Sequence, residues 1–171
     1  MENITHKPVY LVGYMGCGKT TLGKKLANKL GRNFIDLDKL ITTTQGKSIP
    51  EIFASEGEAR FREIEKQCLL DTANMQDVIV ATGGGAPCFF DNMKTMNDRG
   101  VTLYLKLSVG GLFNRLKNAK TERPLIKDLT EEELKDFIAV NLEKREPFYS
   151  QAQHTVLGES IYPEDVISLL A

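Results

Sequence analysis

The segment from Gly13 to Thr20, with the sequence GYMGCGKT, constrains the fold of this chain more than any other feature, because it satisfies the pattern G-x-x-x-x-G-K-S/T. An apolar, strand-forming run precedes it at positions 8–12, and residues 20–30 follow with leucines on one helical stripe. In that context the glycines let the backbone curl until successive N–H groups face inward, and the helix N-terminus adds partial positive charge. The segment therefore predicts a phosphate-binding loop. The alternative, a glycine-rich turn with an exposed lysine, fits this context less well.

Two side chains of this loop suit the chemistry of a nucleoside triphosphate. Lys19 is placed to bridge the outer phosphates, and the hydroxyl of Thr20 is placed to hold Mg²⁺. The guanine-reading motif N-K-x-D is absent, since Asn28-Lys29 is followed by Leu30-Gly31, so GTP specificity has no support. Large mechanical ATPases need a longer chain than 171 residues, which leaves a small phosphotransferase as the favoured class.

Predicted strands alternate with predicted helices along the whole chain. Strands are expected at residues 8–12, 33–38, 78–81, 101–107 and 155–157. Helices are expected at residues 20–30, from 48 to a break at Gly57, at 58–74, at 92–99, from a cap at Ser108, at 130–146 and at 162–171. Because apolar strands without alternation are typical of sheets covered on both faces, the pattern predicts an α/β fold with a parallel sheet in a single domain, residues 1–171.

Composition excludes several classes of protein. Lys and Arg total 22 against 23 Asp and Glu, for a net charge of -1, so the chain lacks the basic surplus of a dedicated nucleic-acid binder. No apolar run approaches the roughly 18 residues of a membrane span, and residues 1–7 lack the apolar core of a secretory signal. The three cysteines have no paired metal-ligand spacing, so reduced thiols and a cytoplasmic location are expected.

Two carboxylates are the candidates for a metal and base site. Many phosphate-loop proteins place a Mg²⁺-directed Asp at the end of a buried strand, but the predicted strand at 78–81 ends without one. Asp36 and Asp38 lie on the alternating segment 33–38, where their spacing puts both on one face of a strand, near the end where α/β sheets bind ligands. One is expected to orient a metal-bound water, and the other to accept a proton or hydrogen bond from an attacking hydroxyl. The alternative is a pair of solvated turn residues.

Two further features have both a functional and a plain structural interpretation. Arg62 and Glu65 are three residues apart on a predicted helix, where the carboxylate could fix the guanidinium, but spacing alone favours a surface pair worth about 0.2–0.5 kcal/mol. Gly83-Gly84-Gly85 follow a predicted strand, and three glycines cost backbone entropy. A ligand bound by their amides would explain them, and a wide turn is the alternative.

Cations cluster between positions 115 and 127, and residues 117–129, with Pro124 and weak periodicity, are predicted to form an exposed loop. These cations are Arg115, Lys117, Lys120, Arg123 and Lys127, opposed there by Glu122 alone. On a mobile loop they would form a cationic lid, and an arginine that closes on a transferring phosphate accelerates the reaction on the order of a thousandfold or more. The alternative is a solvated basic loop. Arg145 lies near the end of a long predicted helix, where a cation also interacts favourably with the helix dipole.

Taken in order, these motifs resemble the shikimate kinases, in the nucleoside-monophosphate-kinase-like group of P-loop proteins. The resemblance runs from about Val9 to Tyr149. It rests on the phosphate loop, Asp36-Leu37-Asp38, Gly57-Glu58, Phe61-Arg62 with Glu65, Gly83-Gly84-Gly85, Arg123-Pro124-Leu125, and Arg145 with Tyr149. It implies a three-layer α/β/α architecture of the P-loop NTPase type with a five-stranded parallel sheet, a substrate-binding helical segment at about 36–65 and a mobile lid at about 115–128.

The resemblance also implies an activity, the transfer of the ATP γ-phosphate to the 3-hydroxyl of shikimate by a monomeric, Mg²⁺-dependent enzyme of aromatic amino acid biosynthesis. The catalytic residues would be Lys19 on the phosphates, Asp38 on the shikimate hydroxyls and their deprotonation, and Arg123 from the lid. The nucleotide-binding set would be Gly16, Cys17, Gly18, Lys19, Thr20, Thr21, Arg123 and Arg115, the last stacked on adenine. Thr20 and Asp36 would hold the metal, with Asp36 behind its waters. The acceptor set would be Asp38, both arginines Arg62 and Arg145 on the carboxylate, and the Gly84 and Gly85 amides on a hydroxyl.

Two other functions fit the same phosphate loop. One is another small-metabolite kinase, such as a gluconate kinase, which Asp38, Arg62 and Arg145 help to distinguish, because an acceptor without a carboxylate gains nothing from two arginines. The other is a regulatory module that binds a nucleotide without turning it over. The presence of the phosphate-contacting and metal-contacting residues argues against that module, and nucleotide binding without turnover of any acceptor would support it.

Overall fold

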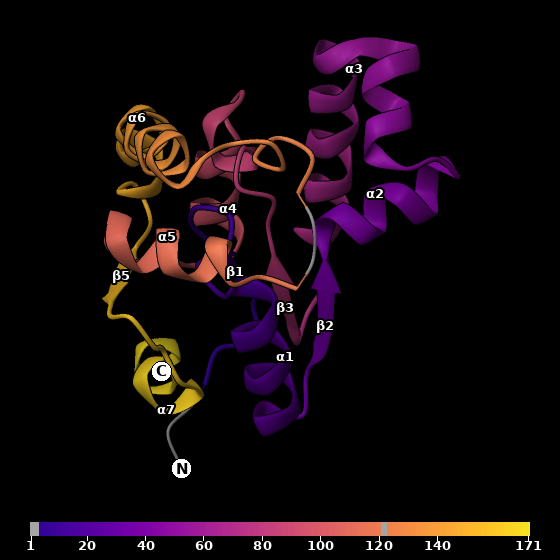
Figure 1. Cartoon of the computed structure of the whole chain (residues 1–171). Coiled ribbons are helices and arrows are strands. Elements are labelled where there is room, and N and C mark those ends of the chain that lie inside the picture. Colours follow the sequence, from indigo (N-terminus) through magenta and orange to yellow (C-terminus); the bar gives the residue numbers. More distant parts are fainter. Residues whose placement is uncertain (1–3, 121–122) are drawn as a thin grey trace.

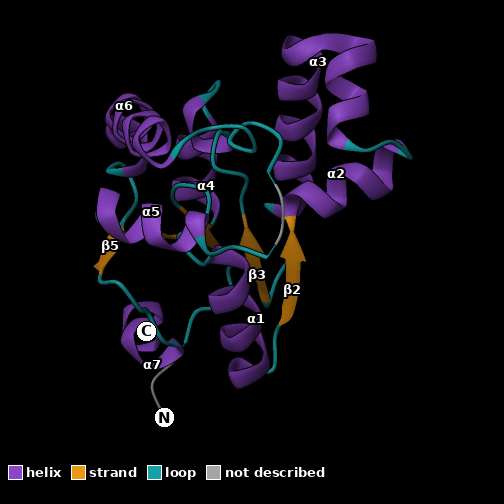
Figure 2. Ribbon diagram, in the orientation of Figure 1, coloured by secondary structure: helices purple, strands orange, loops and turns teal. Residues whose placement is uncertain are grey.

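The computed structural model describes residues 4–120 and 123–171, and its centre is a five-stranded sheet (Figures 1 and 2). In sheet order the strands are β2 (Asn33–Asp36), β3 (Val78–Ala81), β1 (Val9–Val12), β4 (Val101–Lys106) and β5 (His154–Leu157). Every neighbouring pair is parallel, which confirms the predicted sheet. The carboxyl ends of the strands therefore share one edge, and the segments that follow β1, β2 and β3 meet there.

Helices cover both faces of this sheet, which confirms the three-layer architecture (Figure 1). One face carries α1 (Lys19–Leu30) and α7 (Pro163–Ile167). The other face carries α3 (Ile49–Thr72), α4 (Asn92–Arg99), α5 (Val109–Lys117) and α6 (Glu131–Tyr149). Helix α2 (Leu37–Gln45) and the short 3₁₀ turns η1 (Ala86–Cys88) and η2 (Ser168–Leu170) complete the fold. Among residues 4–120 and 123–171, no helix combines the length and apolar character needed to cross a membrane.

Strand β1 shows how one short run serves two cores. Val9 and Leu11 point into the core beneath α1 and α7, whereas Tyr10 and Val12 point into the core beneath the helices of the opposite face. All four side chains are fully buried, because successive residues of a strand face opposite sides and both sides are covered. The absence of polar alternation in this run was therefore a correct sign of a central strand.

The starts of α3 and α6, and a break within α3, follow local rules that the sequence carries. Ser48 and Thr130 begin α3 and α6 with complete capping boxes, reciprocally bonded to Glu51 and Glu133. Gly57 leaves helical geometry inside α3, with φ 83° and ψ 168°, a conformation that favours glycine. The predicted caps and the predicted break at Gly57 are confirmed, and Figure 1 shows the bent α3 standing with α2 beyond the end of the sheet.

Several boundaries differ from the prediction. The strand expected at 33–38 stops at Asp36, and Asp38 lies in the first turn of α2, so the expected common strand face does not exist. The segment expected as a loop from residue 117 starts one residue later, since α5 runs to Lys117. Helix α6 continues past residue 146 to Tyr149, and the predicted C-terminal helix is divided into α7 and η2.

Candidate active site

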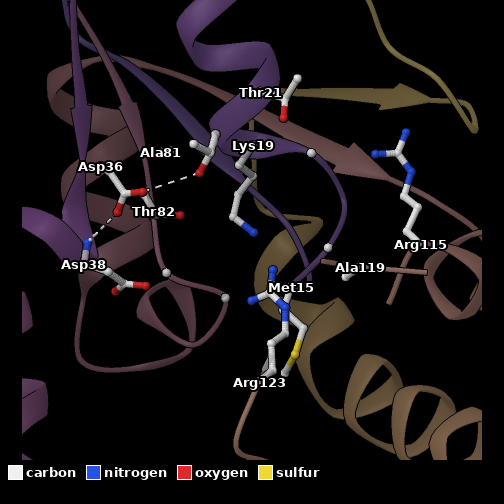
Figure 3. Close-up of a pocket in the computed structure, with 15 residues that line it drawn as sticks. Met15, Lys19, Thr21, Asp36, Asp38, Ala81, Thr82, Arg115, Ala119 and Arg123 are labelled. Atoms are coloured by element: carbon white, nitrogen blue, oxygen red, sulfur yellow. Dashed lines mark hydrogen bonds between the residues drawn. The ribbon is translucent and has the colours of Figure 1, made fainter. Parts of the chain in front are cut away.

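The loop between β1 and α1 has the conformation that phosphate binding requires. Gly16 and Gly18 have φ 79° and 99°, in the left-handed region that side chains disfavour, so a larger residue at either position would strain the loop. Lys19 is 9% exposed, and its Nζ donates to the carbonyls of Gly13 at 2.6 Å and Tyr14 at 3.1 Å. The ammonium group is therefore held across the loop, facing the cleft of Figure 3.

A cleft of about 410 Å³ opens between this loop and the ends of β2 and β3 (Figure 3). It brings together ten predicted site residues: Gly16, Gly18, Lys19, Thr20, Thr21, Asp36, Asp38, Gly84, Arg115 and Arg123. The other four predicted site residues, Cys17, Arg62, Gly85 and Arg145, do not line this cleft. The side chain of Cys17 is buried and lines an adjoining cavity of about 220 Å³, which shares Gly18, Thr21 and Arg115 with the cleft.

The carboxylate of Asp36 has two separate partners, because it stands at the junction of β2 and α2. Its Oδ1 caps α2 by accepting from the amides of Asp38 at 3.0 Å and Lys39 at 3.2 Å. Its Oδ2 accepts from the hydroxyl of Thr20 at 3.4 Å, and a dashed line in Figure 3 joins Asp36 to the amide of Asp38. Asp36 and Thr20 are therefore neighbours, and a helix cap, not a strand face, sets the position of Asp38.

Asp38 lies at the electrostatic centre of the cleft. Burial raises the pKa of its carboxyl group, and the negative charge of Asp36 raises that pKa further. The positive charges of Lys19, Arg62 and Arg123 oppose the rise. Cations from the phosphate loop, from α3 and from the segment after residue 122 therefore all act electrostatically on the carboxylate of Asp38.

The pair of Arg62 and Glu65 is buried, so the surface pair predicted from their spacing is wrong. Nη1 of Arg62 donates to Oε1 of Glu65 at 2.9 Å, and the two side chains are 13% and 1% exposed. The guanidinium also lies 4.0 Å from the ring centre of Phe89. A Cβ added at Gly85 would lie 2.8 Å from two nitrogens of Arg62, so the glycine turn and this arginine pack directly together.

Glu65 makes folding sensitive to pH. Burial raises its pKa from 4.5 to about 7, although Arg62 opposes the rise. Between these two values the folded chain retains a proton that the unfolded chain releases, so the contribution of Glu65 to the free energy of unfolding falls as pH rises. Relative to Glu65→Gln, we expect the wild type to lose on the order of 2 kcal/mol of stability between pH 4.5 and pH 7 in urea unfolding.

Glu63 provides the control for this titration. It lies two residues away on α3, and its carboxylate forms an exposed pair with Arg60. The stability profile of Glu63→Gln should run parallel to that of the wild type over the same pH range. Parallel profiles for Glu65→Gln and the wild type would show that Glu65 has no raised pKa.

Arg145 also packs against the glycine turn. Its guanidinium is 5.5 Å from the ring centre of Tyr14, and a Cβ added at Gly84 would lie 3.2 Å from its Nη1. Arg62 therefore packs on Gly85 and Arg145 packs on Gly84. The two arginines, 83 positions apart along the chain by their numbers, therefore contact neighbouring residues of one turn.

The cationic segment is part helix and part loop. Arg115 lies in the last turn of α5 and donates to the carbonyl of Glu159 at 2.5 Å, and Lys117 pairs with Glu131 at 2.8 Å. The lid expected at 115–128 therefore begins inside α5, and its residues 121–122 lie outside the described part of the chain. Arg123 lines the cleft, and its buried Nε has no partner among residues 4–120 and 123–171.

Some cleft residues were not predicted. Met15, Ala81, Thr82 and Ala119 also line the cleft, as does Gly83, which belongs to the glycine run singled out in the sequence. The hydroxyl of Thr82 donates to the carbonyl of Leu11 at 2.9 Å, which ties the end of β3 to β1. The position of Thr82 at the end of a predicted buried strand, next to the glycines, is the sequence signal that could have identified it.

Together the parallel sheet, the phosphate loop and the acidic and cationic groups around it define a small P-loop kinase. A model of the family described as shikimate kinase matches residues 15–170. This chain belongs to the shikimate kinase family. The match continues through β5 and α7, beyond Tyr149, where the resemblance read from the sequence stopped.

Individual relatives agree with the family match. The chain is 52% identical to a shikimate kinase of Parabacteroides distasonis over 158 residues, which cover 92% of this chain and 91% of the relative. The crystal structure of a Bacteroides thetaiotaomicron shikimate kinase is 45% identical, with a TM-score of 0.90 and 96% of each chain covered. A shikimate kinase of Acinetobacter baumannii in complex with shikimate is 35% identical, with a TM-score of 0.81 over 96% of this chain and 90% of that one.

Proposed function

We propose that this chain transfers the γ-phosphate of ATP to the 3-hydroxyl of shikimate, giving shikimate 3-phosphate and ADP for aromatic amino acid biosynthesis. The observation that carries the proposal is the placement of two arginines, Arg62 and Arg145, on neighbouring glycines of a turn beside the phosphate loop. Planar guanidinium groups suit the two oxygens of a carboxylate. Membership of the shikimate kinase family and the relative solved with shikimate support this acceptor.

The acceptor would bind between α3, α6 and the glycine turn. Arg62 and Arg145 would bind its carboxylate, and the amides of Gly84 and Gly85 would bind a hydroxyl group. Within the described residues, those two amides donate to no protein acceptor, so they are available to a ligand. Asp38, which lines the cleft together with Gly84, would accept from the hydroxyl that reacts.

The nucleotide would bind with its phosphates in the loop, on Lys19 and the amides around Gly16, Cys17 and Gly18. Thr20 and Asp36 would hold Mg²⁺. Their donor set fits this ion, because Mg²⁺ prefers oxygen ligands and takes only one or two of them from the protein beside phosphates and water. When bound, Mg²⁺ supplies charge neutralisation on the phosphate oxygens.

The protein would contribute to the reaction mainly by positioning the reactants and neutralising charge. A bond forms between the 3-oxygen of shikimate and the γ-phosphorus, and the bond from that phosphorus to the β–γ bridging oxygen breaks. The hydroxyl proton passes to Asp38, whose pKa is raised by burial, which makes it a better proton acceptor. Lys19 and Arg123 would stabilise the negative charge on the transferring group.

The nucleotide base would bind where the main cleft meets the adjoining cavity. Arg115 and Thr21 line both the main cleft and the adjoining cavity, so Arg115 would stack on adenine there. The segment 115–128 would close over the phosphates as a lid and bring Arg123 with it. We also propose that the enzyme is monomeric, because one chain supplies every proposed site residue. It would be a cytoplasmic enzyme with one domain, residues 1–171, and the helical segment 36–65 would be its acceptor-binding part.

Substitution Arg62→Lys tests the acceptor site. Lysine keeps the charge but replaces a planar fork by a point charge, so the KM for shikimate should rise about 10- to 100-fold. The KM for ATP should stay within about twofold, because the phosphate loop is unchanged. The matched control is Arg60→Lys, on the exposed side of the same helix and paired with Glu63. Equal KM values for shikimate in Arg62→Lys and Arg60→Lys would contradict the assignment of Arg62.

The proposed reaction is tested by ADP release from Mg·ATP with shikimate, quinate, gluconate and nucleoside monophosphates as separate acceptors. Release that depends on Mg²⁺ and is specific to shikimate is the expected result. Turnover of another acceptor with a flat response to shikimate would keep the phosphate site and overturn the acceptor site. Binding of ATP without turnover of any acceptor would favour the regulatory module.

A further inference from the structure

The last residue of α6, Tyr149, contacts the glycine turn. Its side chain is fully buried, and its hydroxyl donates to the carbonyl of Gly84 at 2.5 Å. The two residues are 65 positions apart and lie on different elements. Core packing alone needs only the ring of a tyrosine, so a hydroxyl bonded to the turn beside the cleft calls for a reason of its own.

The backbone of the glycine turn needs such external contacts. Glycine has more accessible conformations than any other residue, so no side chain of the turn restricts its shape. The carbonyl of Gly83 accepts from the amide of Ala86 at 3.1 Å, and that of Gly85 accepts from the amide of Cys88 at 3.0 Å. Among the described residues, the carbonyl between these two, that of Gly84, accepts only from Tyr149.

Tyr149 also fixes the turn relative to an arginine. Arg145 is one helical turn earlier on α6, and its positive charge lies close enough to oppose the rise in the pKa of Tyr149 that burial causes. The same guanidinium packs against Gly84. One end of α6 therefore presents both the cation and the hydroxyl that holds the neighbouring peptide.

This end of α6 is itself anchored to the sheet. The ring of Tyr149 packs against that of Tyr104, with ring centres 5.2 Å apart. The hydroxyl of Tyr104 donates to Oε2 of Glu146 at 2.5 Å, and Lys106 donates to Oε1 of the same carboxylate at 2.7 Å. Two residues of β4 thus hold α6 between Arg145 and Tyr149, which makes the contact with Gly84 a rigid one.

We propose that Tyr149 is a positioning residue for the acceptor: its hydroxyl sets the Gly84 peptide so that the turn amides and Arg145 bind one molecule together. The inference rests on the proposed function, because it needs an acceptor that carries both a carboxylate and a hydroxyl. Tyr149 does not touch the acceptor in this scheme. Loss of its hydroxyl would remove neither the guanidinium nor the amides. The side chain would, however, no longer fix the position of the amides relative to the guanidinium.

Substitution Tyr149→Phe tests this role, since it keeps the ring and removes the hydroxyl. The KM for shikimate is expected to rise about fivefold to tenfold, as for the loss of one hydrogen bond, while the KM for ATP stays within about twofold. The matched control is Tyr10→Phe. Tyr10 is also fully buried, and its hydroxyl bonds to Thr72 at 3.2 Å, away from the glycine turn. Both variants should lower the melting temperature, but only Tyr149→Phe should change the KM for shikimate.

An equal effect of the two substitutions on the KM for shikimate would overturn the proposal and leave Tyr149 a structural residue. Failure of the proposed function is a separate result, because the wild type would then not phosphorylate shikimate at all. A second measurement needs no variant. In the wild type, exchange of the Tyr149 hydroxyl proton with water, followed by NMR, should slow when shikimate is added, with the Tyr10 hydroxyl as the internal reference. An exchange rate that shikimate leaves unchanged would contradict the positioning role.

Discussion

Substitution Lys19→Ala should lower kcat on the order of a thousandfold, the scale at which loss of one preorganised group acting on developing charge is felt. The structure shows why no neighbour replaces this side chain: Lys19 is nearly buried, and the carbonyls of Gly13 and Tyr14 fix its ammonium group at the mouth of the loop. Initial rates of ADP formation at saturating ATP and shikimate measure the effect. ATP should still bind to the variant, because the loop amides remain.

The control for this prediction lies on the same helix. Lys24 is exposed on α1, outside the residues that line the cleft, and Lys24→Ala should keep kcat within about twofold. Melting temperatures of both variants separate loss of chemistry from loss of folding. A nearly normal rate in Lys19→Ala would rule out the phosphate role of this lysine.

Substitution Arg123→Ala should also lower kcat on the order of a thousandfold or more, the effect of removing an arginine that stabilises a transferring phosphoryl group. Arg123 lines the cleft beside Asp38 and Lys19, and its charge reaches Asp38. The expected effect falls on kcat, because the interaction strengthens as charge develops in the transition state. Arg123→Lys should recover part of the rate, since it restores the charge without the fork.

Lys127 supplies the matched control for Arg123. It is an exposed cation on the same segment and is not among the residues that line the cleft. Lys127→Ala should keep kcat within about twofold. If Arg123→Ala and Lys127→Ala were equally mild, the segment would act only as a basic surface, and the proposal of a catalytic lid would fail.

The sheet could be predicted because its signals are local. Four apolar residues between Pro8 and Gly13 marked β1, and the run at 78–81 marked β3, since strands covered on both faces carry no polar alternation. Capping boxes at Ser48 and Thr130 placed two helix starts. The junction at Asp36 was missed because alternation continued through the cap into α2, so two local rules competed over the same residues.

The candidate site was predictable in its members and less so in its geometry. Asp36 and Asp38 do reach the same cleft, but by a helix cap that no alternation pattern describes. The burial of Glu65 could not be seen from its spacing to Arg62, because exposure depends on what packs over a helix from elsewhere in the chain. The contact of Tyr149 with Gly84 joins residues 65 positions apart, and no local pattern contains it.

The most direct test of the account is the identity of the product. We would incubate the enzyme with Mg·ATP and shikimate and follow the mixture by ³¹P NMR, with proton coupling to locate the new ester. The account predicts that the γ-phosphate signal of ATP is replaced by one phosphomonoester on the 3-oxygen of shikimate, formed in step with ADP. Inorganic phosphate as the sole product, or an ester at another hydroxyl, would contradict the proposed placement of the acceptor between Arg62, Arg145 and Asp38.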